Sequence, residues 1–252
     1  MVPECDPVLL ALLKIQESKK KQIVQAAAEA LGKVLKRQPS LRRQATARLM
    51  VNEGSERHDV LVHSIEKVTR EFPELLEDRR LFMKALAFVK VLTGSMRAAV
   101  LKALERYLLV AKLRRSLDDI NAVALSLLAD AEDVLADISD ENQQAFLQVL
   151  TQIAKLNVDA GDKLLLRVLP RLKQLFAANK NDYSRGLFYD LMVFLYDQFP
   201  ALRPLVKGAL VRGLSDKSKL VRDKLTGFWS NPARLGLDAP LRLQQLMDAL
   251  YT

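Results

Sequence analysis

The sequence contains few of the residues on which β-rich, disulfide-linked or metal-built folds depend. Its 252 residues include nine glycines, nine prolines and 6% aromatic residues, which disfavours a β-sandwich or a barrel. Cys5 is the single cysteine, and there are two histidines. This excludes an internal disulfide framework and a zinc site built from several thiolates. We expect an intracellular protein without a metal site.

Long apolar runs without charge are also missing. The sequence has no stretch of about 18 uncharged apolar residues, the minimum for a transmembrane helix. It begins with the acidic segment MVPECD, which does not resemble a signal peptide. We therefore expect neither a membrane span nor a secretion signal.

The motifs of several enzyme classes are missing too. We find no glycine-rich phosphate loop of a kinase and no P-loop. His58 and His63 are five positions apart and lack the glutamate of the zincin pattern, so surface or core histidines explain them better than metal ligands. The adjacent acids at 118–119 and 132–133 are interpreted as helix caps or solvated faces. The sequence predicts no catalytic residue and no cofactor.

Helix-forming residues with helical spacing dominate what remains. Apolar residues recur at i, i+3 and i+4 along most of the chain, which is typical of amphipathic helices. Loops are indicated at 52–55, at 139–141 and at 179–181. We expect an all-α fold, an α-solenoid of about six HEAT-like helix pairs of the armadillo type. The helices are predicted over 7–37 (two helices, broken near 17–18), 41–51, 56–71, 75–92, 94–115, 119–137, 142–156, 159–177, 183–199, 200–212 and from 216 onward.

The net charge of +9 is distributed unevenly. Residues 1–50 hold ten basic and four acidic residues, whereas 116–154 hold eight acidic residues and no Lys or Arg. Two basic clusters near the start could contact DNA phosphates, although solvated helix turns also explain such clusters. The residues with this possible DNA-facing role are Lys19, Lys20, Lys21, Arg42 and Arg43.

Local patterns near both ends fit HEAT repeats. In the segment 213–225, Asp216 is expected to cap a helix that carries Arg222 on its next turn. Small residues between 26 and 32 would let paired helices approach closely. Trp229 could stack on a nucleic-acid base, but a core position is the simpler interpretation. Each helix pair in such an array must stack on a neighbour.

The C-terminal third resembles a known family. The segments LVRGLSD (210–216), FWSNPARL (228–235) and RLQQLMDALY (242–251) occur in that order and are similar to the middle helical region of the DNA-dependent protein kinase catalytic subunits, which are phosphatidylinositol-3-kinase-related kinases. YDLMVFLYDQF (189–199) and VTREFP (68–73) resemble earlier parts of the same region. The residues that carry this structural motif are Asp216, Arg222, Phe228, Trp229, Ser230, Arg234, Leu235, Arg242, Leu243, Leu250 and Tyr251.

This resemblance implies a role and a set of partners. Residues 55–252 would form part of the HEAT-repeat cradle of a nuclear serine/threonine kinase that acts in non-homologous end joining, and residues 1–54 would be helical repeats of weaker resemblance. The partners would be the rest of the parent kinase, the Ku heterodimer and double-stranded DNA ends, with no membrane. No residue inherits a catalytic role, because the kinase domain lies elsewhere.

One alternative to this segment is a free-standing HEAT adaptor that binds a protein through its concave face. Such an adaptor needs polar terminal caps. The chain stops at Leu250, Tyr251 and Thr252, in the middle of a helix by pattern, which favours a piece of a longer array. A further alternative, an enzyme in its own right, would need a pocket with perturbed ionisable groups.

Overall fold

The computed structural model describes residues 7–15, 21–51, 58–156, 158–231, 234 and 247. These residues form α-helices and short 3₁₀ helices, and no strand occurs among them. The all-α prediction is therefore confirmed. The chain divides into two compact units, 1–164 and 165–252, and the boundary falls within helix α10.

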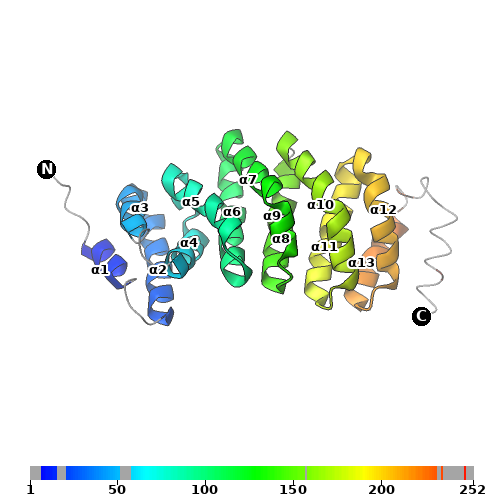
Figure 1. The fold of residues 1–252 in the computed structure, drawn as a ribbon, viewed down its shortest axis with the longest axis horizontal. Coiled ribbons are helices and arrows are strands. Elements are labelled where there is room, and N and C mark those ends of the chain that lie inside the picture. The colour runs from blue at the N-terminus through cyan, green and yellow to red at the C-terminus, as the bar shows by residue number, and fades with distance from the viewer. Residues whose placement is uncertain are drawn as a thin grey trace. The chain divides into compact units, whose positions relative to one another are not determined.

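Figure 1 labels the helices of the described residues along the chain. The bounds of the elements are α1 Pro7–Ile15, α2 Lys21–Arg37, η1 Pro39–Leu41, α3 Arg42–Val51, α4 His58–Glu71, η3 Pro73–Glu77, α5 Arg79–Val91, α6 Gly94–Leu113, α7 Leu117–Ala129, α8 Ala131–Ala136, α9 Asp140–Leu156, α10 Asp159–Ala178, α11 Asp182–Gln198, η4 Pro200–Leu202, α12 Arg203–Arg212, η5 Gly213–Ser215 and α13 Lys219–Ser230.

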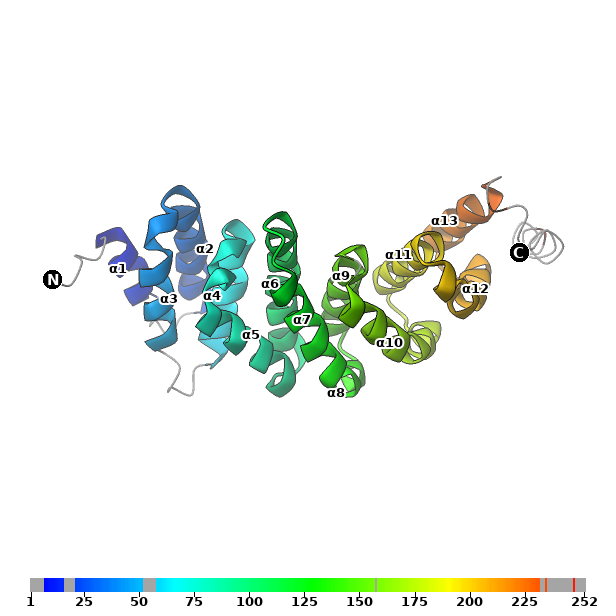
Figure 2. The same ribbon diagram turned by 90° about the horizontal axis from the view of Figure 1, so that it is seen from above.

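The first unit has its helices in two layers. Helices α2, α4, α6 and α9 lie side by side in chain order, each packed on the next (Figures 1 and 2). Helices α5, α7 and α8 contact one another and form a second layer against α6. This arrangement of successive helix layers is that of an α-solenoid. The core of this unit includes Leu31, Ile65, Leu104 and Leu150, each fully buried.

Close approach of two helices explains a small residue in this unit. A Cβ atom added to Gly32 of α2 would lie 2.9 Å from the Val68 carbonyl oxygen of α4. Real Cβ atoms do not approach backbone so closely, so only glycine fits. The prediction that small residues allow close helix pairing is confirmed at this position.

The second unit contains the rest of α10 and the elements from α11 to α13. Helix α11 contacts both α12 and α13, and η5 contacts both of those helices. Phe176 of α10 stacks on Phe188 of α11 with ring centroids 5.1 Å apart. The nearly all-round apolar sequence of α11 predicts burial on several sides, but the buried residues recur every three to four positions along one face, and Leu187 and Phe194 are only half-buried.

Several expected boundaries are wrong. The predicted helix 75–92 is two elements, because Asp78 caps α5 by accepting hydrogen bonds from the amides of Arg80 and Leu81. The predicted helix 119–137 breaks at Asp130 into α7 and α8. The break allows Asn142 to donate to the carbonyls of Val134 and Asp137 where α8 ends. Loop 52–55 lies outside the described residues.

Candidate functional site

The basic residues predicted to face DNA have different environments. Arg42 is partly buried, forms an ion pair with Glu77 of η3 and donates to the Glu74 carbonyl. Arg43 is exposed to solvent. Lys21 is the first residue of α2, while Lys19 and Lys20 lie outside the described residues. Arg42 therefore holds helix α3 to η3, and Arg43 is available to bind an anion.

Three basic side chains surround one buried carboxylate, that of Glu66 on α4. Arg106 of α6 donates to it at 3.1 Å and to the Glu66 backbone carbonyl at 2.8 Å. Arg70 donates at 3.1 Å, and the Lys67 ammonium lies 3.4 Å away. Burial raises the pKa of Glu66, but the hydrogen bond and charge of Arg106, the charge of Lys67 and the hydrogen bond from Arg70 together hold the pKa below its usual range. The cluster joins α4 to α6.

A second buried pair joins α6 to the end of α8. The Arg97 side chain is 3% exposed, lies 3.7 Å from Asp137 and donates to the Asp133 carbonyl. Asp137 also accepts from the amide of Gly94, the first residue of α6. Burial raises the pKa of Asp137, but hydrogen bonds from Gly94 and Ser139 and the charge of Arg97 hold the pKa below its usual range. Asp137 thus caps α6 from a distant segment.

The lowered pKa values of Glu66 and Asp137 lead us to expect that the folded chain loses stability in acid. Both pKa values are lower in the folded chain than in the unfolded chain, so their contribution is complete above the unfolded values of about 4. This contribution to stability is lost as the pH falls through the lower pKa values of the folded chain. We expect the thermal midpoint, followed by circular dichroism from pH 7 to pH 2.5, to fall less steeply in the variant Glu66→Gln/Asp137→Asn than in wild type.

The matched control for this experiment is Asp223→Asn, because Asp223 is exposed on α13. This variant is expected to keep the wild-type decline. An unchanged slope in the double variant would show that neither carboxylate contributes to the pH dependence.

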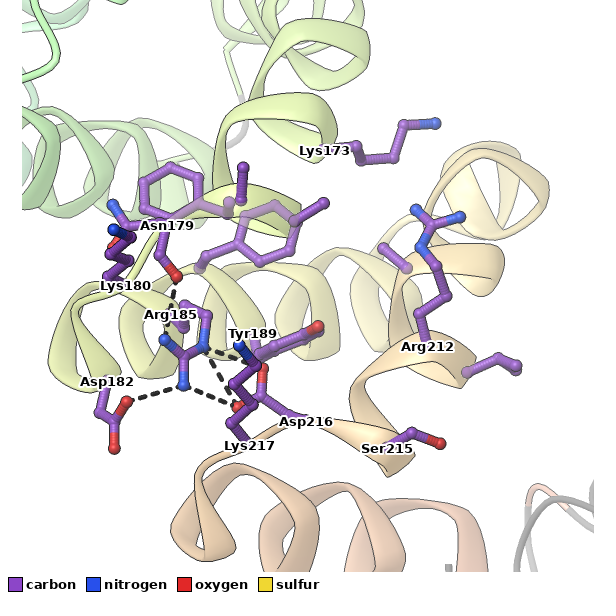
Figure 3. Close-up of a pocket in the computed structure, with 16 residues that line it drawn as sticks. Lys173, Asn179, Lys180, Asp182, Arg185, Tyr189, Arg212, Ser215, Asp216 and Lys217 are labelled. Atoms are coloured by element: carbon purple, nitrogen blue, oxygen red, sulfur yellow. Dashed lines mark hydrogen bonds and ion pairs between the residues drawn. The ribbon is translucent and has the colours of Figure 1, made fainter. Parts of the chain in front are cut away.

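The second unit contains an open groove of about 790 Å³ between the C-terminal end of α10, the first half of α11, the end of α12 and η5 (Figure 3). Five basic and two acidic side chains line it. Its apolar lining includes Val211 of α12 and the rings of Phe188 and Tyr189. Sequence reasoning missed this groove, because its five cations come from five separate segments and form no cluster in the sequence.

One side of the groove is fixed by a buried ion pair. Arg185 of α11 and Asp216 each have 7% of the side chain exposed, and the guanidinium donates to both carboxylate oxygens at 2.9–3.2 Å. Arg185 also donates to Asp182 and to the Asn179 carbonyl. The hydrogen bond with Asp216 is the main reason why the pKa of Arg185 is raised. The pair joins α11 to the turn that follows η5.

The turn before α13 differs from the expected capping pattern. Helix α13 begins at Lys219 with Ser218 as its N-cap residue, so Asp216 does not cap it. Asp216 accepts from the Ser218 amide at 2.8 Å instead, while Arg222 donates to the Asp216 carbonyl at 2.6 Å. Asp216 and Arg222 are in contact, but through the backbone carbonyl of Asp216, because Arg185 binds the Asp216 carboxylate.

The motif residues around Trp229 belong to the core. Trp229 is 2% exposed and packs edge-on against Phe228 and Tyr196, with centroids 5.0 and 5.6 Å away. Arg234 lies over the Phe228 ring at 3.9 Å and donates to Asp197. The core interpretation of the tryptophan is therefore confirmed. Ser230 donates to a carbonyl within α13, and the remaining motif residues, Leu235, Arg242, Leu243, Leu250 and Tyr251, lie outside the described residues.

No group of three or more potential metal ligands occurs in the part of the chain that the structure describes. His58 packs instead against the Phe88 ring at 5.5 Å. None of the described helices has both the length and the hydropathy that a membrane span requires.

The fold and these contacts define a class of protein: an all-α solenoid whose buried charges join one helix to the next. A family model described as "DNA-PKcs, CC5" matches residues 8–252. The chain therefore belongs to the DNA-PKcs CC5 family and corresponds to a helical, non-kinase segment of that protein.

A curated relative agrees with this assignment. The chain is 36% identical over 81 residues to the DNA-dependent protein kinase catalytic subunit of Dictyostelium discoideum. The aligned part is 29% of this chain and 2% of that relative. The chain thus matches a small part of a much longer protein.

Proposed function

We propose that this chain is a HEAT-type scaffold segment in the cradle of a DNA-PKcs-like serine/threonine kinase that acts in the nucleus, in double-strand break repair by non-homologous end joining. The rest of the parent kinase, the Ku heterodimer and double-stranded DNA ends are its proposed partners. Within the segment, we propose residues 1–54 as helical repeats and residues 55–252 as the cradle part. The proposal rests on the family match over residues 8–252.

The pairing of buried charges between different elements supports a scaffold role. Glu66 with Arg106, Arg97 with Asp137, and Arg185 with Asp216 each link two different elements. Breaking a buried pair is strongly destabilising, so these pairs resist separation of the helices that they join. A catalytic site would instead direct perturbed groups toward a bound substrate. Buried pairs that hold successive elements together would transmit force along a stack of helices.

We further propose that Lys19, Lys20, Lys21 and Arg43 face DNA. Arg42 was predicted to share this role, but its guanidinium is held by Glu77 and the Glu74 carbonyl, so we assign it to the scaffold. Each phosphate that the other four residues neutralise would release counterions and make binding depend on salt.

The test of this DNA-facing role is fluorescence anisotropy of a short blunt duplex at several salt concentrations. We expect wild type to bind at about 50 mM salt. The variant with Gln at Lys19, Lys20, Lys21 and Arg43 should bind more weakly, and its log–log salt slope should fall by about 0.9 for each lost phosphate contact.

A control variant with the same change in charge has Gln at Lys90, Lys112, Lys163 and Lys219, which are exposed on other elements. It should retain the wild-type slope. Equal log–log salt slopes for the two variants would show that DNA is attracted only by net charge. If the wild-type chain is helical but does not bind the duplex, the proposed DNA-facing role is wrong.

A further inference from the structure

The groove of the second unit has an excess of positive charge that the protein does not neutralise. Of its cations, Arg185 is paired with Asp216. Lys180, Arg212 and Lys217 are exposed and take part in no ion pair among the described residues. In Figure 3, Lys180 lies at one end of the groove and Arg212 at the other, with Lys217 below. The groove is therefore positive along its length.

A second feature of the groove is an unused hydrogen-bond donor. Tyr189 is 7% exposed, and its hydroxyl has no hydrogen-bond partner in the described part of the chain. Figure 3 shows the hydroxyl end of the ring turned to the side of the groove where Arg212 lies. A donor left open inside a cationic groove is suited to an anionic ligand.

The ring of Tyr189 is held in place from below. A Cβ added to Gly213 would lie 2.6 Å from the Tyr189 Cε1 atom, so the ring rests directly on this glycine. Phe188 packs edge-on against the same ring, with centroids 5.1 Å apart. Burial raises the pKa of Tyr189, which keeps the hydroxyl protonated at neutral pH. The donor is thus fixed before any ligand arrives.

We propose that this groove binds a short acidic peptide segment of a partner protein that also carries aliphatic or aromatic side chains. One carboxylate of the peptide accepts from the Tyr189 hydroxyl and pairs with Arg212. A second acidic residue reaches Lys180 or Lys217. Its apolar side chains pack on Val211 and the neighbouring alanines of the lining.

Charge complementarity and the mixed lining favour such a peptide over a nucleic-acid backbone. Asp182, with 66% of its side chain exposed, lies in the lining and would repel a phosphate that passed it. A polyphosphate chain also leaves the apolar part of the lining unused. A peptide can place its acids at the cations and its apolar residues elsewhere.

The experiment uses a fluorescein-labelled 12-residue peptide of alternating Glu–Leu and Asp–Phe pairs and the whole 252-residue chain, with anisotropy as the readout. We expect binding at about 50 mM salt, weakened about tenfold by Arg212→Gln and several-fold by Tyr189→Phe. Lys219→Gln, which removes an exposed cation of α13 outside the lining, should bind like wild type. A peptide with Gln and Asn in place of the acids should not bind.

Tyr189→Phe separates ligand binding from folding. It removes a hydroxyl that has no partner in the described structure, so its thermal midpoint should equal that of wild type. If Lys219→Gln weakens binding as much as Arg212→Gln, or if the two groove variants bind like wild type, the groove is not the peptide site. If a duplex of about 20 base pairs displaces the peptide and its own binding falls equally with Arg212→Gln, the surface is a nucleic-acid site and the proposal is wrong.

Discussion

Replacing Arg185 with Met is expected to destabilise the second unit by about 3–5 kcal/mol, because the substitution leaves the Asp216 carboxylate buried with no compensating cation. Arg185 donates three hydrogen bonds to this carboxylate, and the Ser218 amide donates another. A single amide donor does not replace a guanidinium.

Urea unfolding followed by the fluorescence of Trp229 measures this loss. Trp229 is the only tryptophan in the chain and lies in the second unit, so its signal reports on the unit that contains the pair. The matched control is Arg212→Met, which removes an exposed arginine without an ion pair and should change stability by less than about 0.5 kcal/mol. A loss below about 1 kcal/mol for Arg185→Met would contradict the structural role of the pair.

One further result would identify the cause of the destabilisation. The double variant Arg185→Met/Asp216→Leu removes both charges and should recover much of the stability, as buried ion pairs replaced by apolar residues often do.

Trp229→Ala is expected to cost about 3–5 kcal/mol, because it leaves a cavity where a fully buried indole packs against Phe228 and Tyr196. The indole Nε1 has no hydrogen-bond partner among the described residues. Trp229→Phe therefore loses volume but no hydrogen bond, and it should cost about 1–2 kcal/mol. Urea unfolding followed by circular dichroism at 222 nm measures both variants.

The losses of stability in the two tryptophan variants show whether Trp229 belongs to the core. If Trp229→Phe were as harmful as Trp229→Ala, the indole N–H would have a partner that matters for stability. If Trp229→Ala cost less than about 1 kcal/mol, Trp229 would not be part of the core, and stacking on a ligand would become the better interpretation.

Helical periodicity predicted the fold well, because each helix buries a stripe that recurs every three to four residues. Elements such as α4, α9, α10 and α11 lie within one or two residues of their expected bounds. The break of 119–137 was not predicted, because nothing in the pattern of residues near Asp130 indicates it. The contacts that accompany the break, from Asn142 of α9 to the carbonyls at the end of α8, join separate elements.

The site was less predictable for the same reason. A run such as Lys19–Lys21 is visible in the sequence as a charge cluster, whereas the groove takes its cations from α10, the turn 179–181, α11, α12 and the turn after η5. The expected capping role of Asp216 was wrong because Arg185, 31 positions away, occupies its carboxylate. Asp78 is a signal that was present in the sequence: an aspartate shortly before the first apolar position of a helix, here Leu81, is a capping pattern.

The most direct test of the scaffold role is DNA-stimulated kinase activity of a full-length parent kinase that carries Arg185→Met in this segment. If the segment is a scaffold, DNA stimulation should fall while the KM for ATP stays unchanged, and Arg185→Met/Asp216→Leu should restore the stimulation. If the single variant destabilises the isolated chain as predicted but leaves DNA stimulation at the wild-type level, the segment does not support the kinase and the scaffold proposal is wrong.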